Sequence, residues 1–149
     1  MKTITFYSYK GGVGRSLALV NFAYYLVRKG QKVFLLDLDL EAPGLHYKLT
    51  DAPVERGVVD YLHALLYEPE AEPELGPHVL DVPTPFDGEL RLLPAGNALS
   101  TDYTRKLVRF NWLELFHGAG QLGDEFAHVG GGEAGGVVAG LEIDGGLGQ

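Results

Sequence analysis

The feature that most constrains the fold is a glycine-rich loop, KGGVGRS at residues 10–16, set between two segments of different periodicity. A β-like run covers residues 3–8, and an apolar helical pattern begins at Leu17. The glycines of the loop permit conformations that turn successive backbone N–H groups toward one point, where they can surround phosphate oxygens. The order of strand, loop and helix therefore predicts a binding site for a nucleoside triphosphate.

The last two residues of the loop carry its side-chain chemistry. Ser16 falls in the first turn of the expected helix, where unpaired N–H groups favour an anion and the hydroxyl can ligate Mg²⁺. Arg15 stands where the common phosphate-loop pattern has lysine. Arginine keeps the positive charge and can grip phosphate bidentately, but its planar fork is bulkier than an ammonium group, so the loop predicts binding more directly than turnover. The alternative is a glycine-rich turn that binds nothing.

A second run, residues 32–39, ends in two acids. Its continuous apolar part indicates a buried parallel strand, and ligands bind at the carboxyl ends of such strands. Asp37 and Asp39 are two residues apart, so they share a face if the strand persists that far, and both could approach a Mg²⁺–phosphate group. The alternative is that these acids merely end a strand in solvent.

These residues resemble the ParA/MinD group of P-loop ATPases, whose deviant Walker A loop reads KGG-x-GK-[ST]. The matching positions are Lys10, Gly11, Gly12, Val13, Gly14 and Ser16, with Arg15 in place of the lysine. The run YSYKGGVGRSLALVNFA followed by DLDLEAPGL is similar to the subset of bacterial ATPases with arginine in the loop, over roughly residues 1–45. LLPAGN at residues 92–97 also resembles the group.

The resemblance implies roles for individual residues. Residues 10–16 would bind ATP, with Lys10 also reaching the nucleotide of a partner subunit and thereby serving catalysis. Ser16 and Asp37 would hold Mg²⁺, and Asp39 would position the attacking water. It further implies an ATP-dependent homodimer that works as a switch, although no motif identifies a protein partner. Two alternatives stay open: a nucleotide-binding or interaction module without turnover, and a truncated fragment without independent activity.

The expected fold class is α/β, a P-loop-like, mostly parallel sheet with flanking helices that is incomplete at its C-terminal end. Beyond the first βαβ unit, helical spacing covers residues 57–67 and a short strand covers residues 90–93. Residues 68–87, rich in proline and acids, are expected to form an irregular surface loop. A last helix is expected over residues 101–116, with Ser100 as N-cap. Its apolar side would carry Val108, Trp112, Leu115 and Phe116.

The chain changes character at His117. Residues 1–116 are interpreted as the N-terminal part of a P-loop ATPase domain, and residues 117–149 as a glycine-rich acidic tail that is irregular or non-native. Our hypothesis is that this tail is a truncated or frame-shifted product. Its best substitute for the missing switch II strand is residues 137–144, which read as a strand ending in Asp144, although an interior glycine weakens that pattern.

Composition excludes several classes of protein. The absence of cysteine rules out disulfides, thiolate zinc sites and cysteine-held iron–sulfur clusters. No apolar stretch is long enough to span a bilayer and no secretory core precedes Lys10, so a cytoplasmic location is expected. A net charge of −8 argues against a broad nucleic-acid surface. One helix could carry a small basic face of Arg105, Lys106 and Arg109, which we interpret as a solvated helix face.

Overall fold

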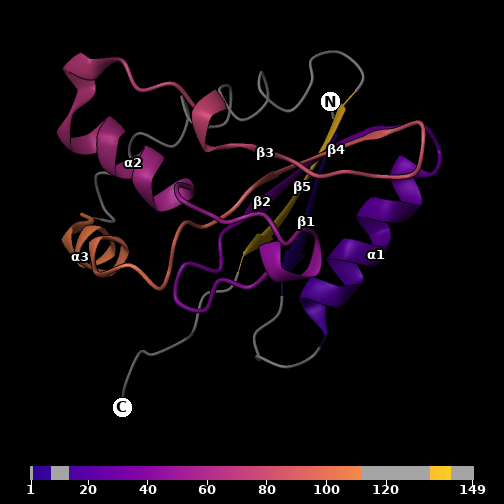
Figure 1. Ribbon diagram of the computed structural model, residues 1–149, viewed down its shortest axis with the longest axis horizontal. Coiled ribbons are helices and arrows are strands. Elements are labelled where there is room, and N and C mark those ends of the chain that lie inside the picture. Colours follow the sequence, from indigo (N-terminus) through magenta and orange to yellow (C-terminus); the bar gives the residue numbers. More distant parts are fainter. Residues whose placement is uncertain (1, 8–13, 112–134, 142–149) are drawn as a thin grey trace.

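The computed structural model describes residues 2–7, 14–111 and 135–141. A five-stranded sheet of order β1-β5-β2-β4-β3 forms its centre (Figure 1). The strands are β1 (Lys2–Tyr7), β2 (Lys32–Asp37), β3 (Leu80–Asp81), β4 (Glu89–Leu93) and β5 (Gly135–Leu141). The helices are α1 (Arg15–Val27), α2 (Val58–Tyr67) and α3 (Thr101–Arg109), and short 3-10 helices cover His46–Lys48, Pro69–Ala71 and Gly76–His78.

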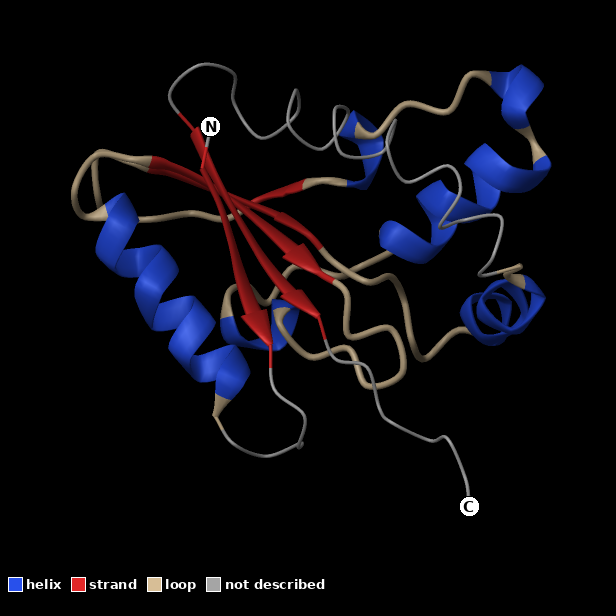
Figure 2. Ribbon diagram, turned by 180° about the vertical axis from the view of Figure 1, so that it is seen from behind, coloured by secondary structure: helices blue, strands red, loops and turns tan. Residues whose placement is uncertain are grey.

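The sheet is mostly parallel. β1 pairs with β5, β5 with β2, and β2 with β4, each in the parallel direction, whereas the edge strand β3 runs antiparallel to β4. Helix α1 covers one face, and α2 and α3 lie on the other side (Figure 2). The expected α/β class, with a mostly parallel sheet and flanking helices, is therefore confirmed.

Alternating side chains of β2 feed two separate apolar clusters. Val33 and Leu35 pack with buried residues of α1, while Phe34 and Leu36 pack with buried residues of α2 and α3. All four are at most 5% exposed. A strand that is buried on both faces reads as a continuous apolar run rather than an alternating one. The interior parallel strand expected in the run 32–39 is therefore confirmed as far as Asp37, where β2 ends.

Glycines mark both ends of α1. Gly14, the N-cap, has φ 81°, and its carbonyl accepts the first helical hydrogen bond from the amide of Ala18 at 2.9 Å. After the helix ends at Val27, Gly30 takes φ 73° and donates to the carbonyl of Val27 at 2.9 Å. Both glycines adopt the left-handed region that disfavours residues with a Cβ, which fixes where the helix begins and ends.

Helix α2 begins against the backbone that follows β4. The amide of Val58 donates to the carbonyl of Pro94 at 2.8 Å, and the amide of Val59 donates to the carbonyl of Ala95 at 3.0 Å. The first amides of a helix have no partner within the helix, so these two bonds join α2 to the carboxyl end of the sheet. The helix expected over 57–67 and the strand expected over 90–93 are both present.

Residues 68–87 are more ordered than expected. They contain two 3-10 helices and β3, which pairs residue by residue with β4 through Leu80↔Leu92 and Asp81↔Arg91. Leu75 and Val82 are buried on either side of this strand. The proline-rich composition correctly indicates the absence of long elements, but an edge strand of two residues depends on its partner and has no local signature.

The expectation for the last helix is right at its start and wrong at one of its apolar positions. Ser100 caps α3 by accepting the amide of Asp102 at 3.1 Å. Val108, expected in the core, is 80% exposed, whereas Tyr103 and Phe110 are buried. Val108 lies on the exposed face of α3 with Thr104 and Arg105, whereas Tyr103 and Leu107 form the face that packs on the core. The helix ends at Arg109, and Phe110 is extended. Trp112, Leu115 and Phe116 lie outside the described residues.

Seven residues of the C-terminal segment form a strand, where the segment as a whole is expected to be irregular and residues 137–144 to be strand-like. Residues 135–141 form β5, a central strand whose backbone pairs with β1 on one edge and β2 on the other. Pairing on both edges satisfies the backbone groups of a glycine-rich strand without needing side-chain contacts. The division of the chain at residue 116 and the origin of the tail stay predictions. Asp144 lies outside the described residues.

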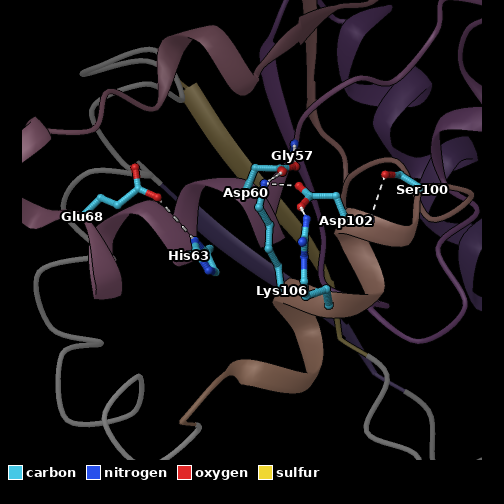
Figure 3. Close-up of polar contacts among 8 residues, drawn as sticks. Gly57, Asp60, His63, Glu68, Ser100, Asp102 and Lys106 are labelled. Atoms are coloured by element: carbon cyan, nitrogen blue, oxygen red, sulfur yellow. Dashed lines mark hydrogen bonds and ion pairs between the residues drawn. The ribbon is translucent and has the colours of Figure 1, made fainter.

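Two findings bear on partners. Arg105 pairs with Asp102 one turn earlier on α3, and Lys106 contacts Asp102 at 2.7 Å and Asp60 at 2.8 Å (Figure 3). Two of the cations expected on this helix face therefore have acidic neighbours, which supports the interpretation as a solvated face. Within the described residues, every helix is too short or too polar to cross a membrane.

Candidate nucleotide-binding site

The candidate site lies at the carboxyl edge of the sheet. β1, β5 and β2 run in the same direction, with Tyr7 opposite Leu141 and Asp37 opposite Gly140 at their ends. The arrowheads of these strands meet at one edge, and the amino end of α1 lies at this edge too (Figure 2). Open parallel sheets bind ligands at this edge, and the unpaired N–H groups of a helix start favour anions.

Part of the phosphate loop is described. Gly14 caps α1, and Arg15 and Ser16 are its first two residues, both half-buried. Lys10, Gly11, Gly12 and Val13 lie outside the described residues, so their assignment to the nucleotide stays a prediction. The positions of Arg15 and Ser16 at the first turn of the helix match the place that a phosphate loop requires of its terminal residues.

The structure brings Arg15 and Asp39 together. The guanidinium Nη2 lies 3.3 Å from Oδ2 of Asp39, and the two side chains are 11% and 18% exposed. The other oxygen of Asp39 accepts the amide of Ala42 at 3.2 Å. The aspartate assigned to water positioning and the arginine assigned to phosphate binding thus face each other beside the start of α1. The sequence assigned both residues to one site but did not predict that they would pair.

Asp37 has a different environment from Asp39. It is the last residue of β2, is 4% exposed, and its two oxygens accept the amides of Asp39 and Leu45, each at 3.2 Å. Because β2 ends there, the two acids do not lie on a continued strand face; instead the chain folds back so that Asp37 holds the loop from residue 38 to residue 45. Burial raises the pKa of Asp37, opposed by these amides and by the charge of Arg15.

The raised pKa of Asp37 predicts a pH-dependent loss of stability in metal-free protein. The folded state holds this proton more tightly than the unfolded chain does, so stability falls as pH rises from the ordinary value of 3.8 through the higher folded pKa. A tenfold difference in proton affinity between the folded and unfolded states corresponds to about 1.4 kcal/mol. Asp37→Asn cannot titrate there, although it loses one acceptor for a backbone amide.

Urea unfolding in EDTA should therefore show that Asp37→Asn is less stable than wild type near pH 4. The difference in the free energy of unfolding between the two proteins should narrow toward pH 7. A difference that stays constant or widens over this range would contradict the prediction. Asp87→Asn, an exposed aspartate, is the matched control and should show no such trend.

The donors at this edge fit a magnesium ion. The hydroxyl of Ser16 and the carboxylates of Asp37 and Asp39 are hard oxygen ligands, the kind that Mg²⁺ takes together with waters and substrate phosphates. Within the described part of the chain there is no group of three or more His, Cys, Asp or Glu side chains arranged to hold a metal alone. The fitting arrangement is one in which Ser16 and a carboxylate share the ion with a nucleotide.

Sequence reasoning missed one residue that contacts the site loop. The phenol of Tyr103, on α3, donates to the carbonyl of Leu40 at 2.7 Å in a buried position. Leu40 directly follows Asp39, but 63 residues separate it from Tyr103. No local pattern links the two, because Tyr103 reads only as an apolar helix position.

Comparison with known proteins supports the fold. The family model of an AAA domain matches residues 1–57. A ParA family ATPase from Chlorobium tepidum TLS superposes with a TM-score of 0.61 at 20% identity, over 97% of this chain and 53% of that one. The septum site-determining protein MinD from Pyrococcus horikoshii OT3, complexed with Mg-ADP, gives 0.59 at 20% identity, over 96% and 50%.

A third solved structure extends the range of chemistry on this fold. Cobyrinic acid a,c-diamide synthase from Mycobacterium smegmatis, with bound ADP and magnesium, gives a TM-score of 0.60 at 22% identity, over 93% of this chain and 50% of that one. No curated protein sequence gives a significant match. The chain spans about half the length of the solved structures that it matches. The common feature is the fold of the ParA/MinD P-loop ATPases.

Proposed function

We propose that this chain binds Mg-ATP at the carboxyl edge of its sheet and acts as part of a ParA/MinD-type switch ATPase. The observation that carries the proposal is the contact of Arg15 with Asp39, at 3.3 Å, beside the first turn of α1, with the buried Asp37 two residues before Asp39. A cation, two carboxylates and a helix start at the end of parallel strands are the parts that a phosphate and metal site requires. The Mg-ADP complex of MinD on the same fold supports this choice of ligand.

Each residue of the site has a proposed task. The amides of residues 11–16 and the guanidinium of Arg15 neutralise phosphate charge, and Ser16 and Asp37 hold Mg²⁺ directly or through water. The ion, when bound, offsets charge on the phosphate oxygens. Asp39 orients a water for attack on the terminal phosphorus. Lys10 provides a cation to the nucleotide of a second subunit, which makes two copies close over ATP.

A second candidate is a binding module without turnover. The observation that favours it is the use of both oxygens of Asp37 as acceptors for backbone amides, which leaves this carboxylate engaged by its own loop. The chain would then bind nucleotide through its loop and helix start and release no phosphate. Binding is common to both candidates, so it is the property to test first.

A thermal unfolding scan with and without Mg-ATP tests the proposed binding. Ligand at about 100 times its dissociation constant adds about 2.7 kcal/mol to a folded state that alone binds it, which raises the midpoint of a domain this size by about 5–10 °C. The double variant Lys10→Ala plus Ser16→Ala should lose this rise.

The matched control for that scan is Lys29→Ala plus Thr101→Ala, which also removes one lysine and one hydroxyl. Both residues are exposed, and Lys29 lies past the carboxyl end of α1, opposite the proposed site. The control should keep the full rise. A cooperative wild-type transition that Mg-ATP leaves unchanged would refute the proposed function.

A further inference from the structure

We propose that Tyr103 is a positioning residue for the site, which holds the loop after β2 so that Asp39 faces Arg15. The inference rests on the proposed function for its meaning in catalysis, but the contact itself belongs to the nucleotide-free chain. It assigns a task in the site to α3, a helix that carries none of the phosphate-loop residues.

The hydrogen bond of Tyr103 reaches the backbone one residue beyond Asp39. Its phenol donates to the carbonyl of Leu40 at 2.7 Å, and Tyr103 and Leu40 are 5% and 8% exposed. Polar groups buried this deeply need their partners, so breaking the bond leaves the carbonyl of Leu40 without compensation from water. The amides of Asp39 and Leu45 tie the same loop to Asp37. Tyr103 therefore gives the loop a second anchor, which comes from α3 and adds to the bonds of Asp37 at the end of β2.

The ring of Tyr103 packs closely against Gly96. Gly96, at φ 135°, lies so close that a Cβ there would be 2.9 Å from two ring carbons and 3.2 Å from Oδ2 of Asp60. The same oxygen of Asp60 accepts the amide of Gly57 at 3.0 Å, at the start of α2 (Figure 3). The ring is thus fitted against the segment that follows β4, and its phenol has little freedom to leave Leu40.

Helix α3 is itself fixed to α2 by a charged cluster. Lys106 bridges Asp60 of α2, at 2.8 Å, and Asp102 of α3, at 2.7 Å (Figure 3). The side chains of Lys106 and Asp60 are 23% and 16% exposed, which shields this ion pair from solvent more than a surface pair. The first amides of α2 bind the backbone after β4, so the contacts between α2 and α3 also hold α3 in place relative to the sheet.

The electrostatic surroundings keep the phenol protonated. Burial raises the pKa of Tyr103, and the carboxylates of Asp37, Asp60 and Asp39 raise it further. The hydroxyl therefore stays a hydrogen-bond donor at neutral pH.

Hydrogen exchange on the nucleotide-free chain tests the inference with Tyr103→Phe, which keeps the ring and removes the donor. The amides of Asp39, Ala42 and Leu45 should exchange about fivefold faster, the effect expected of one lost net hydrogen bond on a local opening equilibrium. Amides in the middle of β2 and β4 report global stability in the same experiment. The local increase must exceed any change at those reference amides.

The matched control is Tyr67→Phe. The phenol of Tyr67 also donates to a backbone carbonyl, that of Arg109, at 2.5 Å, but it ties α2 to the end of α3 rather than to the site loop. This variant should leave the three loop amides unchanged relative to the reference amides. If Tyr103→Phe changes the loop amides no more than the reference amides, the phenol is merely structural and the inference is overturned.

A nucleotide arm separates this inference from the proposed function. Mg-ATP should protect the loop amides of the wild type, and Tyr103→Phe should retain less than half of that protection at equal occupancy. If Mg-ATP fails to bind the wild type, the proposed function fails while the nucleotide-free exchange still decides whether Tyr103 positions the loop. If Mg-ATP protects the loop equally in both proteins, the positioning role is overturned although binding is established.

Discussion

Replacing Gly57 with alanine is expected to lower the free energy of unfolding by about 3 kcal/mol, the largest effect expected of one added methyl group at the glycines that the structure describes. A Cβ at this position would lie 2.1 Å from the carbonyl oxygen of Pro94, 2.5 Å from the amide nitrogen of Gly96 and 2.7 Å from the carbonyl carbon of Ala95. All three are backbone atoms, which cannot rotate away as a side chain can. The helix start must therefore move, which also strains the hydrogen bonds from Val58 and Val59 to this segment.

Urea denaturation of wild type, Gly57→Ala and Gly76→Ala measures this effect. Gly76 is exposed, and a Cβ there would meet nothing within 4 Å, so its variant should stay within about 0.5 kcal/mol of wild type. Complete loss of a cooperative transition in Gly57→Ala would be the strong form of the expected result. A loss below about 1 kcal/mol would contradict the close contact between the start of α2 and residues 94–96.

The parts of the fold that the sequence predicts are those with dense local signals. A glycine at each end and an apolar stripe between them predict helix α1, and an uninterrupted apolar run predicts β2. Both patterns work because the two faces of the sheet are covered, so burial leaves its mark on consecutive residues. The same local signals identify Ser100 as a cap, since a capping serine acts on an amide only two residues away.

The parts that escape prediction depend on partners far along the chain. β5 overlaps the strand expected at residues 137–144, but its interior glycines weaken that local signal, and its central place depends on β1 and β2, which pair with its backbone on both edges. β3 has only two residues and likewise takes its structure from β4. Val108 fits the apolar period of a longer helix, but Tyr103 and Leu107 form the face of α3 that packs on the core, and Val108 lies on the exposed face.

The site shows the same division. The loop chemistry of Arg15 and Ser16 and the acids at 37 and 39 are readable from residue type and order, because phosphate loops and strand ends are local features. The inward turn of Asp37 onto the amides of its own loop is not readable, since it depends on the course of the chain as far as Leu45. The contact of Tyr103 depends on how α3 packs, which no short pattern encodes.

Arg15 and Asp39 are expected to affect nucleotide affinity in opposite directions. Arg15→Ala removes the cation that would bind phosphate and should weaken Mg-ATP binding about 100-fold, the loss expected for charge-assisted, bidentate hydrogen bonds. Arg15→Lys keeps the positive charge but not the planar guanidinium, so its affinity for Mg-ATP should lie between those of the wild type and Arg15→Ala. Asp39→Ala should instead strengthen binding by up to about fivefold, because the partly buried pair at 3.3 Å no longer competes with phosphate for the guanidinium.

Isothermal titration with Mg-ATP measures these affinities, and the pair of Lys32 and Glu89 is the matched control. Their ion pair is 2.8 Å long and exposed, and it lies at the amino ends of β2 and β4, opposite the site. Lys32→Ala and Glu89→Ala should each leave the affinity within about twofold of wild type, as expected for exposed charges far from the ligand. Equal weakening by Arg15→Ala and Lys32→Ala would show that only net charge matters, and the proposed contact with phosphate would be wrong.

Asp39→Ala also separates an ATPase from a binding module, because affinity and turnover should change in opposite directions. In the ATPase, removing the group that orients water lowers the rate of phosphate release by about 100-fold or more while Mg-ATP binds at least as tightly. Asp51→Ala is the control, since Asp51 is exposed, whereas Asp60 is engaged by Lys106 and Gly57 and its loss would disturb the fold. Tight binding of Mg-ATP by the wild type without phosphate release would assign the chain to the module. Release that survives Asp39→Ala would place the water-positioning group elsewhere in the chain.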